Sequence, residues 1–534
     1  MTVRNLADAV QPHTQAEAAI CIIGAGIAGL FAGRRLAAQG HRVIILESGL
    51  RAFDPAIHDL NRVEDPGGQF VHSYNGRYRG LGGSSSQWGG RMIPMTAHDM
   101  GARPYLGVEA WPFDVRELEK YRAEIEDVFV VDHGSFEEGI LDKLDAKSRV
   151  HRGDPDFTLR YPKWPTFTRC NLSVQFADEI QNWPNLEIWL GATVSDFELD
   201  SEKGTIAAIT AKDFARRTVT VRAGQFLFAA GTIEVTRLLL QLDRASAGRA
   251  FAGCDVLGRY FNDHLGAPVG MLEPRDWATT IRWFGYYFIE STRRNLHIEM
   301  TGKAQEEERV PSAFAQVFIN PPEKSGLNVI KNVLRGLQRR ELDFKPRDLL
   351  YLMKDAWPMA MTGYWRYVRN QLYLPRSMPL SLSIWVEQMP QRQNRITLAG
   401  QADRLGSPMA HVDWQADASD DRTFRACLRR LEAYWERAGL ARACPVKWSQ
   451  AALDEGLSIA AGAEDLGHPS GTTRMGTDPS QAVVAPDLAC HHIGNAWVAS
   501  ASVFPSMGSA NPTYTIIQIA LRAADALGRR LGSL

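Results

Sequence analysis

The chain has 534 residues, of which 45% are hydrophobic and 23% charged, a composition typical of a soluble globular protein of one or two domains. The formal net charge is −1, which gives no electrostatic case for nucleic acid as a partner. No run of about 18 apolar residues occurs, so the sequence predicts no membrane-spanning helix.

The cysteines are few and scattered, and none forms a CxxC pair: Cys21, Cys170, Cys254, Cys427, Cys444 and Cys490. Such usage is compatible with a reducing compartment, and the first residues contain no apolar signal-peptide core. We therefore expect a cytoplasmic protein. His491 and His492 are adjacent, but no Cys or acid stands at a helpful spacing, so no metal site is predicted.

A nucleotide-binding motif lies near the N-terminus. An apolar run at 19–24 predicts a buried strand, a helix should cover about 27–39, and 42–46 predicts a second strand. In the intervening turn, Gly24 permits the tight bend, Gly26 lets amides approach a pyrophosphate, and Gly29 lets helix and strand pack closely. Glu47 follows, where a carboxylate accepts from a ribose hydroxyl and disfavours a 2′-phosphate. The motif alone does not separate FAD from NAD.

A second glycine cluster favours FAD. The segment 79–94, RGLGGSSSQWGGRMIP, is too rich in small residues for a core helix or strand and suits a flat ligand. Further pieces of the same domain are predicted as a strand at 225–228 with a helix after it, a short strand at 497–499 and a last helix from Pro512 to about Arg529. The nucleotide domain is thus assembled from distant segments, and those between must build something else.

Segment 331–376 stands out by its charge. It holds ten Lys or Arg against four acids, an excess of +6, together with seven aromatic residues, and two helices are plausible. One interpretation is a helical lid packed on the substrate domain; the other is a surface facing anionic lipid or a lipid-linked substrate. We favour the lid, because no hydrophobic helix face in the sequence is clean enough to insert.

Taken together, five motifs resemble the glucose–methanol–choline (GMC) oxidoreductases: the Gly24 turn with Glu47, GLGGSSSQWGG, AAGTIEVTRLLL at 229–240, LGRYFNDHLG at 257–266, and the HPSGT…ANPT end. EQMPQRQNRITL at 387–398 leans toward the sugar and gluconate-type branch. The resemblance implies an α/β, Rossmann-like FAD-binding fold with a second α+β substrate-binding domain on a mostly antiparallel sheet. The implied domains are an FAD-binding domain in parts 17–100, 187–265 and 460–534, an excursion or cap at 101–186, and a substrate-binding domain at 266–459.

The resemblance also implies which residues contact FAD. They are Gly24, Gly26, Ile27, Ala28, Gly29, Glu47, Gly82, Gly83, Ser84, Ser85, Trp88, Gly89, Gly90, Val194, Ala230, Gly231, Ser500, Ala501, Asn511, Pro512 and Thr513. Two departures from the family pattern matter. Gln87 stands where some members tether the flavin through a histidine, so we expect non-covalent FAD. The stretch 499–502 reads Ala-Ser-Ala-Ser where many members have an Asp that meets the flavin, which puts that contact in doubt.

Two residues match the family's catalytic positions. His468, in H-x-x-G-T, corresponds to the base that takes the hydroxyl proton while a hydride passes from the carbinol carbon to flavin N5. Asn511 corresponds to the second position, where it can hold the substrate oxygen. Since Pro512 follows, Asn511 should also mark the N-terminus of the last helix, whose dipole would stabilise negative charge on the flavin. We interpret His264 as mainly structural.

The predicted function is therefore FAD-dependent oxidation of an alcohol group of a sugar, glycoside or polyol to a carbonyl. The electron acceptor is open among oxygen, a quinone and a protein, and weak membrane-surface contact through 331–376 is a further interaction to test. Two alternatives keep the fold: a lyase with structural flavin, and a non-catalytic flavoprotein at a membrane surface.

Overall fold

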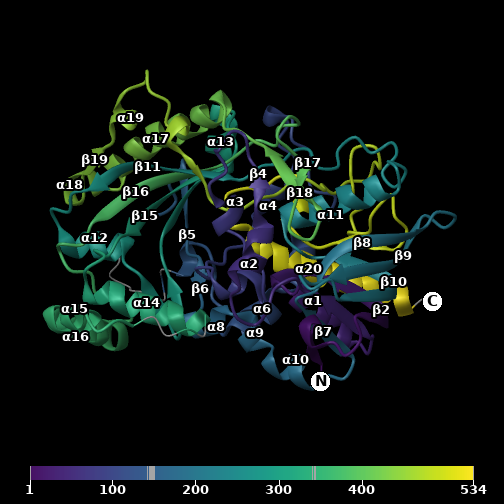
Figure 1. The fold of residues 1–534 in the computed structure, drawn as a ribbon. Helices are drawn as coiled ribbons and strands as arrows, with labels where there is room; N and C mark the ends of the chain where they lie inside the picture. Colours follow the sequence, from purple (N-terminus) through teal and green to yellow (C-terminus); the bar gives the residue numbers. More distant parts are fainter. Residues whose placement is uncertain (1, 141, 143–150, 340, 342–343, 533–534) are drawn as a thin grey trace.

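A computed structural model of the chain describes residues 2–140, 142, 151–339, 341 and 344–532. Arg340 and Asp343 of the basic segment lie outside this range. Two sheets and two hydrophobic cores organise the fold, and Figure 1 shows them side by side, the mainly parallel sheet near both termini and the antiparallel sheet in the other half. None of the helices in the described ranges is long and apolar enough to cross a membrane.

The first sheet is the nucleotide-binding one. Its strand order is β1 (Val3–Asn5), β7 (Leu186–Leu190), β3 (Val43–Leu46), β2 (His13–Ile23), β10 (Thr218–Phe228), β9 (Thr205–Lys212) and β8 (Thr193–Asp200), with β21 (Ala496–Val498) also on β10. The strands from β1 to β10 and β21 pair in parallel, while β8 and β9 pair antiparallel. The helices of this half are α1 (Ile27–Ala38), α11 (Thr232–Ala245) and α20 (Pro512–Gly532). The predicted βαβ order is confirmed.

Two features of this sheet exceed the prediction. β2 begins at His13 rather than near residue 19, because its first half alternates between exposed and half-buried side chains and only its second half is fully buried. β1 adds an edge strand beside β7. Residues before 17 therefore belong to the nucleotide domain, ahead of the boundary we expected.

The second sheet is antiparallel throughout its described pairings. Its order is β19 (Val446–Trp448), β11 (His264–Leu272), β16 (Leu380–Glu387), β15 (Ala313–Ile319), β14 (His297–Met300) and β5 (Phe157–Arg160), with β20 (Glu464–Asp465) on β11. Two small sheets join β12 (Tyr287–Ile289), β13 (Thr292–Arg294) and β6 (Lys163–Trp164), and β17 (Arg395–Ala402), β18 (Pro408–Asp413) and β4 (Val63–Glu64). The expected substrate-domain sheet is present.

The remaining helices pack around these sheets. They are α2 (Pro55–His58), α3 (His72–Asn75), α4 (Ala97–Met100), α5 (Arg116–Glu119), α6 (Arg122–Phe129), α8 (Phe167–Cys170), α9 (Leu172–Gln175), α10 (Ala177–Asn182), α12 (Trp277–Phe284), α13 (Gly302–Glu308), α14 (Gly326–Arg339), α15 (Asp348–Lys354), α16 (Ala356–Tyr364), α17 (Ala418–Arg437), α18 (Leu440–Ala443) and α19 (Gln450–Leu453). The basic segment thus holds parts of three helices and a π-helix at Trp365–Arg369, not two helices.

The segment 101–186 divides between the two cores. Phe129 and Phe176 belong to the core of the nucleotide domain, whereas Phe157 and Tyr161 belong to that of the substrate domain. The segment is therefore not one cap. It threads between the two halves and contributes a strand, β5, to the edge of the antiparallel sheet.

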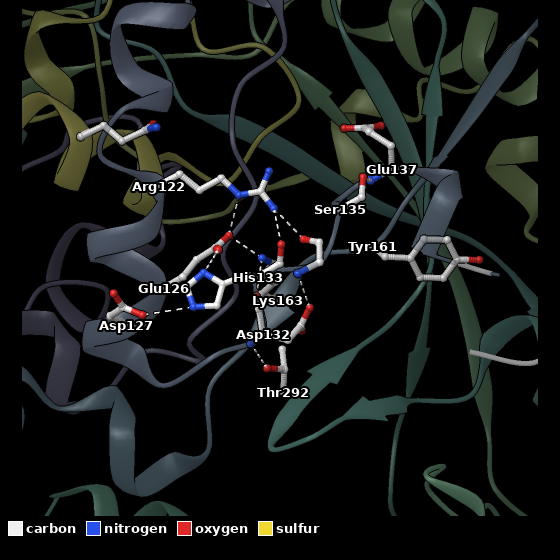
Figure 2. Close-up of polar contacts among 12 residues, drawn as sticks. Arg122, Glu126, Asp127, Asp132, His133, Ser135, Glu137, Tyr161, Lys163 and Thr292 are labelled. Atoms are coloured by element: carbon white, nitrogen blue, oxygen red, sulfur yellow. Dashed lines mark hydrogen bonds and ion pairs between the residues drawn. The ribbon is translucent and has the colours of Figure 1, made fainter. Parts of the chain in front are cut away.

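A buried polar cluster around Lys163 ties these pieces together (Figure 2). The fully buried Lys163 ammonium donates to the Asp132 carbonyl oxygen at 2.6 Å and also contacts the Glu126 carboxylate of α6. The Asp132 N–H donates to Thr292 Oγ at 2.6 Å, which brings in β13. Burial lowers the pKa of Lys163 to about 8, although the Glu126 carboxylate opposes the shift. The charges of Lys163 and Glu126 neutralise one another, so this cluster holds the neighbouring segments together and is not a candidate binding site.

Candidate active site

A cavity of about 530 Å³ lies between the two domains. It is lined by His468, by Asn511 and by all but three of the predicted FAD-contacting residues. The exceptions are Gly29, Gly82 and Ser85, which stand behind the wall: Gly82 N–H donates to Ala25 O, and Ser85 Oγ donates to Gly82 O. The motifs from both ends of the chain therefore meet around one space.

The first glycine turn has the geometry that a dinucleotide requires. Gly24 has φ +103°, which a residue with a side chain rarely adopts, and a Cβ on Gly29 would lie 1.9 Å from Gly24 O. A Cβ on Gly26, in contrast, would meet nothing within 4 Å. The space beside Gly26 is thus open to a ligand, while the other two glycines serve the turn and the helix packing.

Three helices begin at the cavity, at Ile27 of α1, Thr232 of α11 and Pro512 of α20. The N-cap residues of α1 and α11 are Gly26 and Gly231, and neither supplies a side-chain cap. Free N–H groups and the positive ends of the helix dipoles therefore face the cavity. This arrangement suits the pyrophosphate of a dinucleotide.

Glu47 is buried at the cavity edge and organises the loops around it. Its Oε2 accepts from Ala25 N at 2.8 Å, and its Oε1 accepts from Gly49 N at 2.7 Å and Gly80 N at 3.1 Å. Burial raises the pKa of this carboxyl, and the three backbone donors oppose that rise. The carboxylate thus joins the first glycine turn to the second. Its contact with a ribose hydroxyl stays a prediction.

The second glycine segment packs directly on the first, since a Cβ on Gly83 would lie 2.7 Å from Gly26 Cα. Trp88 faces the cavity, while Gln87 lies beside it and hydrogen-bonds Tyr78. At the late Ala-Ser-Ala-Ser stretch, Ser500 and Ala501 line the cavity. Ser500 Oγ lies 2.5 Å from Ser502 Oγ, so a hydroxyl pair stands at the stretch where the resemblance led us to expect an Asp in many family members.

His468, the predicted catalytic base, is held in one tautomer by a second histidine. His264 Nε2 lies 2.8 Å from the carbonyl oxygen of Gly508, which can only accept, so this nitrogen carries a proton and His264 Nδ1 is an acceptor. His468 Nδ1 lies 3.1 Å from His264 Nδ1 and must therefore donate to it. The lone pair of His468 Nε2 is left on the side facing Asn511, as a general base requires. His264, expected to be mainly structural, thus orients the base.

The surroundings keep His468 neutral. Burial lowers its pKa well below the ordinary histidine value, and the nearby His264, Arg91 and His72 lower it further. Its backbone N–H donates to Asp263 Oδ2 at 2.7 Å, and Leu466 N–H donates to Asp263 Oδ1 at 3.2 Å. The fully buried Asp263 carboxyl therefore fixes the loop that carries the base.

Asn511 completes the pair. Its Nδ2 lies 3.3 Å from His468 Nε2, and its Oδ1 is buried without a hydrogen-bond partner among the described residues. A buried acceptor left unpaired is costly, so it calls for a donor from a ligand, such as a hydroxyl or a ring N–H. As predicted, Asn511 stands directly before the first residue of α20.

The opposite wall of the cavity holds residues that we did not predict as site residues: Arg91, Trp164, Tyr286, Asn295, Gln316, Phe318 and Trp385. Arg91 is 7% exposed as a residue; its guanidinium donates to Gln316 Oε1 and to His297 Nδ1 and lies 5.8 Å from the centre of the Trp385 ring. It forms no ion pair with a carboxylate in the described ranges. The sequence signal for Arg91 was its position directly after Gly89 and Gly90, since these glycines line the cavity and the next residue lies beside it.

These residues fit FAD. The open side of Gly26, the uncapped helix starts and the unpaired Asn511 Oδ1 offer donors, space and an acceptor along one continuous cavity. Residues of the two glycine segments, with Val194, Ala230 and Gly231, would hold the dinucleotide, and the His468–Asn511 pair lies at the substrate end. When bound, the flavin supplies the hydride acceptor for alcohol oxidation.

Comparisons with known proteins find two family models and several oxidases. Residues 390–520 match the family model GMC oxidoreductase, and residues 22–87 match the model NAD(P)-binding Rossmann-like domain. Paromamine 6'-oxidase of Streptomyces fradiae is 22% identical, covering 96% of this chain and 92% of that protein. C-glycoside 3-oxidase of Arthrobacter globiformis is 28% identical over 27% of this chain and 26% of its own length.

A solved structure shares the whole architecture. A variant of formate oxidase from Aspergillus oryzae RIB40 superposes with a TM-score of 0.59 at 15% identity, over 97% of this chain and 99% of that one. Fold and site together define an FAD-dependent oxidoreductase that acts on CH–OH groups. The chain is thus similar to GMC oxidoreductases, through the family model at 390–520 and through paromamine 6'-oxidase over 96% of its length.

Proposed function

We propose that the alcohol oxidised belongs to a sugar, glycoside or polyol, within the sugar and gluconate-type branch of the family. The observation that carries the proposal is the His468–Asn511 pair, which leaves one basic nitrogen and one amide on the same cavity as Arg91 and Gln316. Guanidinium and amide groups hydrogen-bond hydroxyls, and the Trp385 ring offers an apolar face to a pyranose. The names of paromamine 6'-oxidase and C-glycoside 3-oxidase support the same substrate class.

The residues divide the work as follows. The reacting hydroxyl donates its hydrogen bond to His468 Nε2 and accepts one from Asn511 Nδ2, which fixes the carbinol carbon toward the cofactor. His468 takes the hydroxyl proton, and its Nδ1–H contact with His264 keeps the ring from turning. The buried wall excludes water from the reacting atoms.

A substrate panel tests this proposal. Holoenzyme is mixed without oxygen with neutral sugars, glycosides, polyols and simple alcohols, and bleaching of the flavin absorbance is followed. Rapid bleaching by a sugar, glycoside or polyol is expected. Bleaching by simple alcohols alone would refute the substrate class. Turnover without bleaching would favour the lyase alternative, and a flavin that no alcohol bleaches or turns over would favour a non-catalytic flavoprotein.

Non-covalent attachment of FAD is part of the proposal. It is supported by Gln87, since glutamine offers no imidazole to bond the flavin, and by its place beside the cavity rather than on its wall. Acid or heat should release free FAD into the supernatant. Yellow colour that stays with the acid-precipitated protein would contradict it.

The acceptor and the cellular setting complete the proposal. Oxygen, a quinone or a redox protein reoxidises the flavin, and oxygen uptake compared with reduction of a quinone analogue distinguishes them. Weak membrane-surface contact of 331–376 is included, supported by its excess of basic residues. A cytoplasmic location is supported by six free cysteines, five of them buried. Fractionation of cells producing the protein tests both.

A further inference from the structure

The basic segment has two structurally different ends. At the end of α14, Gln338 is 2% exposed, and its Nε2 donates to the carbonyl oxygens of Ser85 and Trp88, both at 3.0 Å. Gln338 O accepts from Asn171 Nδ2 at 3.0 Å. This end is therefore anchored to the second glycine segment at the cavity, as the lid interpretation expects.

The other end exposes an apolar stripe. Nine of the 17 exposed large hydrophobic side chains among the described residues fall between Leu337 and Val368. Along α15, α16 and the π-helix they recur at helical spacing: Leu349, Leu350, Met353, Trp357, Tyr364, Tyr367 and Val368, with Trp357 72% and Tyr367 82% exposed. Such a stripe is rare on a monomer unless it meets a partner. These exposed side chains argue against our expectation that no apolar helix face here can insert, and the vesicle experiment below tests that expectation.

The charge around the stripe is positive. Lys345, Arg347, Lys354 and Arg369 are exposed, and none forms an ion pair within the described ranges. The acids nearby serve the backbone instead: Asp348 accepts from Lys345 N at 2.8 Å, and Asp355 accepts from Gly326 N at 2.7 Å at the start of α14. Figure 1 shows α15 and α16 at the outer edge of the molecule, where a flat surface can reach them.

We infer that the α15–α16 face, defined by these apolar and basic residues, docks on an anionic lipid bilayer. Aromatic and aliphatic side chains enter the boundary between headgroups and acyl chains, while Lys and Arg contact the anionic headgroups. A second copy of the chain fits less well, because it would face these basic residues with the same charge. The inference deepens the membrane-surface contact of 331–376 in the proposed function, on which it rests, by naming the face and the lipid; it does not depend on the proposed substrate.

Vesicle co-sedimentation of the holoenzyme tests the inference. The enzyme should pellet with vesicles of phosphatidylcholine and phosphatidylglycerol at low salt, bind pure phosphatidylcholine far less, and dissociate as salt screens the charges. W357E should reduce binding at least tenfold. L453E is the matched control, since Leu453 on α19 is 65% exposed but lies outside the face, and it should bind like wild type.

Charge reversal gives a second pair of variants. Lys354→Glu should weaken binding to the mixed vesicles about fivefold or more, since each basic residue near an anionic surface contributes a similar factor. Arg442→Glu, an exposed site elsewhere, should have no effect. Flavin absorbance and melting temperature of every variant should match wild type.

Three outcomes would overturn the inference. They are no pelleting at low salt, equal loss of binding in W357E and L453E, and salt-insensitive binding to pure phosphatidylcholine. Concentration-dependent dimerisation that W357E abolishes, with no vesicle binding, would assign the face to a second copy instead.

Discussion

The two walls of the cavity are built in different ways. The nucleotide wall is made largely of backbone: Gly26, Gly231 and the uncapped starts of α1 and α11. The substrate wall is made of side chains such as Arg91, Gln316 and Trp385, which come from separate strands and loops. A site made of backbone can be predicted from local sequence, because the spacing of the glycines determines the conformation of the binding loop. A side-chain site depends on sheet register, which brings together residues far apart in the chain.

His468→Ala should show the largest difference between the effect on substrate oxidation and the effect on FAD binding. The rate of flavin reduction by substrate should fall roughly 10²–10⁴-fold, since a general base is removed, while FAD content stays close to wild type. Rapid-mixing absorbance measures the first and cofactor analysis the second. His13→Ala, at an exposed histidine on β2, should change neither. Reduction of the His468 variant at the normal rate would remove it from the mechanism.

Glu47→Ala should have the opposite effect, weakening FAD binding without slowing the reduction of bound flavin. FAD affinity should fall on the order of 10–150-fold, because the variant loses charge-assisted hydrogen bonds, while flavin that remains bound is reduced at the normal rate. Titration of the apoprotein with FAD measures the affinity. Glu198→Ala, at an exposed acid on β8, should leave it unchanged. Wild-type affinity in Glu47→Ala would mean that the loops joined by this carboxylate hold without it.

Arg91→Gln should affect the substrate wall alone. KM should rise roughly tenfold or more through loss of hydrogen bonds from a charged donor, with FAD affinity unchanged. Arg91→Lys keeps the charge but loses the planar fork, so it should raise KM as well. Unchanged KM in both variants would show that Arg91 does not contact substrate.

The smallest effect should be a shift in pH dependence. Since the pKa of His468 lies well below its ordinary value, the base is neutral above about pH 7, and flavin reduction should be flat there and fall only under more acidic conditions. Removing the Arg91 charge favours the protonated imidazole, so Arg91→Gln should move the inflection upward, whereas Arg91→Lys should not. An inflection that stays in place in Arg91→Gln would mean the two groups are not coupled.

The sequence predicted most of the nucleotide half, and the reason is physical. The buried end of the strand before Gly24, the helix after it and the helix opened by Pro512 were all predicted within a few residues, because buried runs and turn residues fix them locally. His468 and Asn511, predicted from flanking motifs, are brought together at 3.3 Å.

What the sequence left out depends on tertiary contacts. The path of Phe129 and Phe157 into different cores is invisible before the chain is folded. The role of His264 depends on its contact with one carbonyl oxygen, Gly508 O, which no sequence pattern predicts. The exposed apolar side chains of α15 and α16 were missed because exposure depends on what packs against a helix, which the sequence does not show.

In the proposed mechanism, the paired histidines also determine where the proton goes after His468 has taken it. The row of hydrogen bonds runs from His468 to His264 and ends at the Gly508 carbonyl, which is not basic enough to accept a proton from imidazole. No exit to solvent opens by that path. The proton must leave His468 from the nitrogen that received it, through the cavity that also releases the product. The proton and the ketone or aldehyde product therefore leave through the same opening of the cavity.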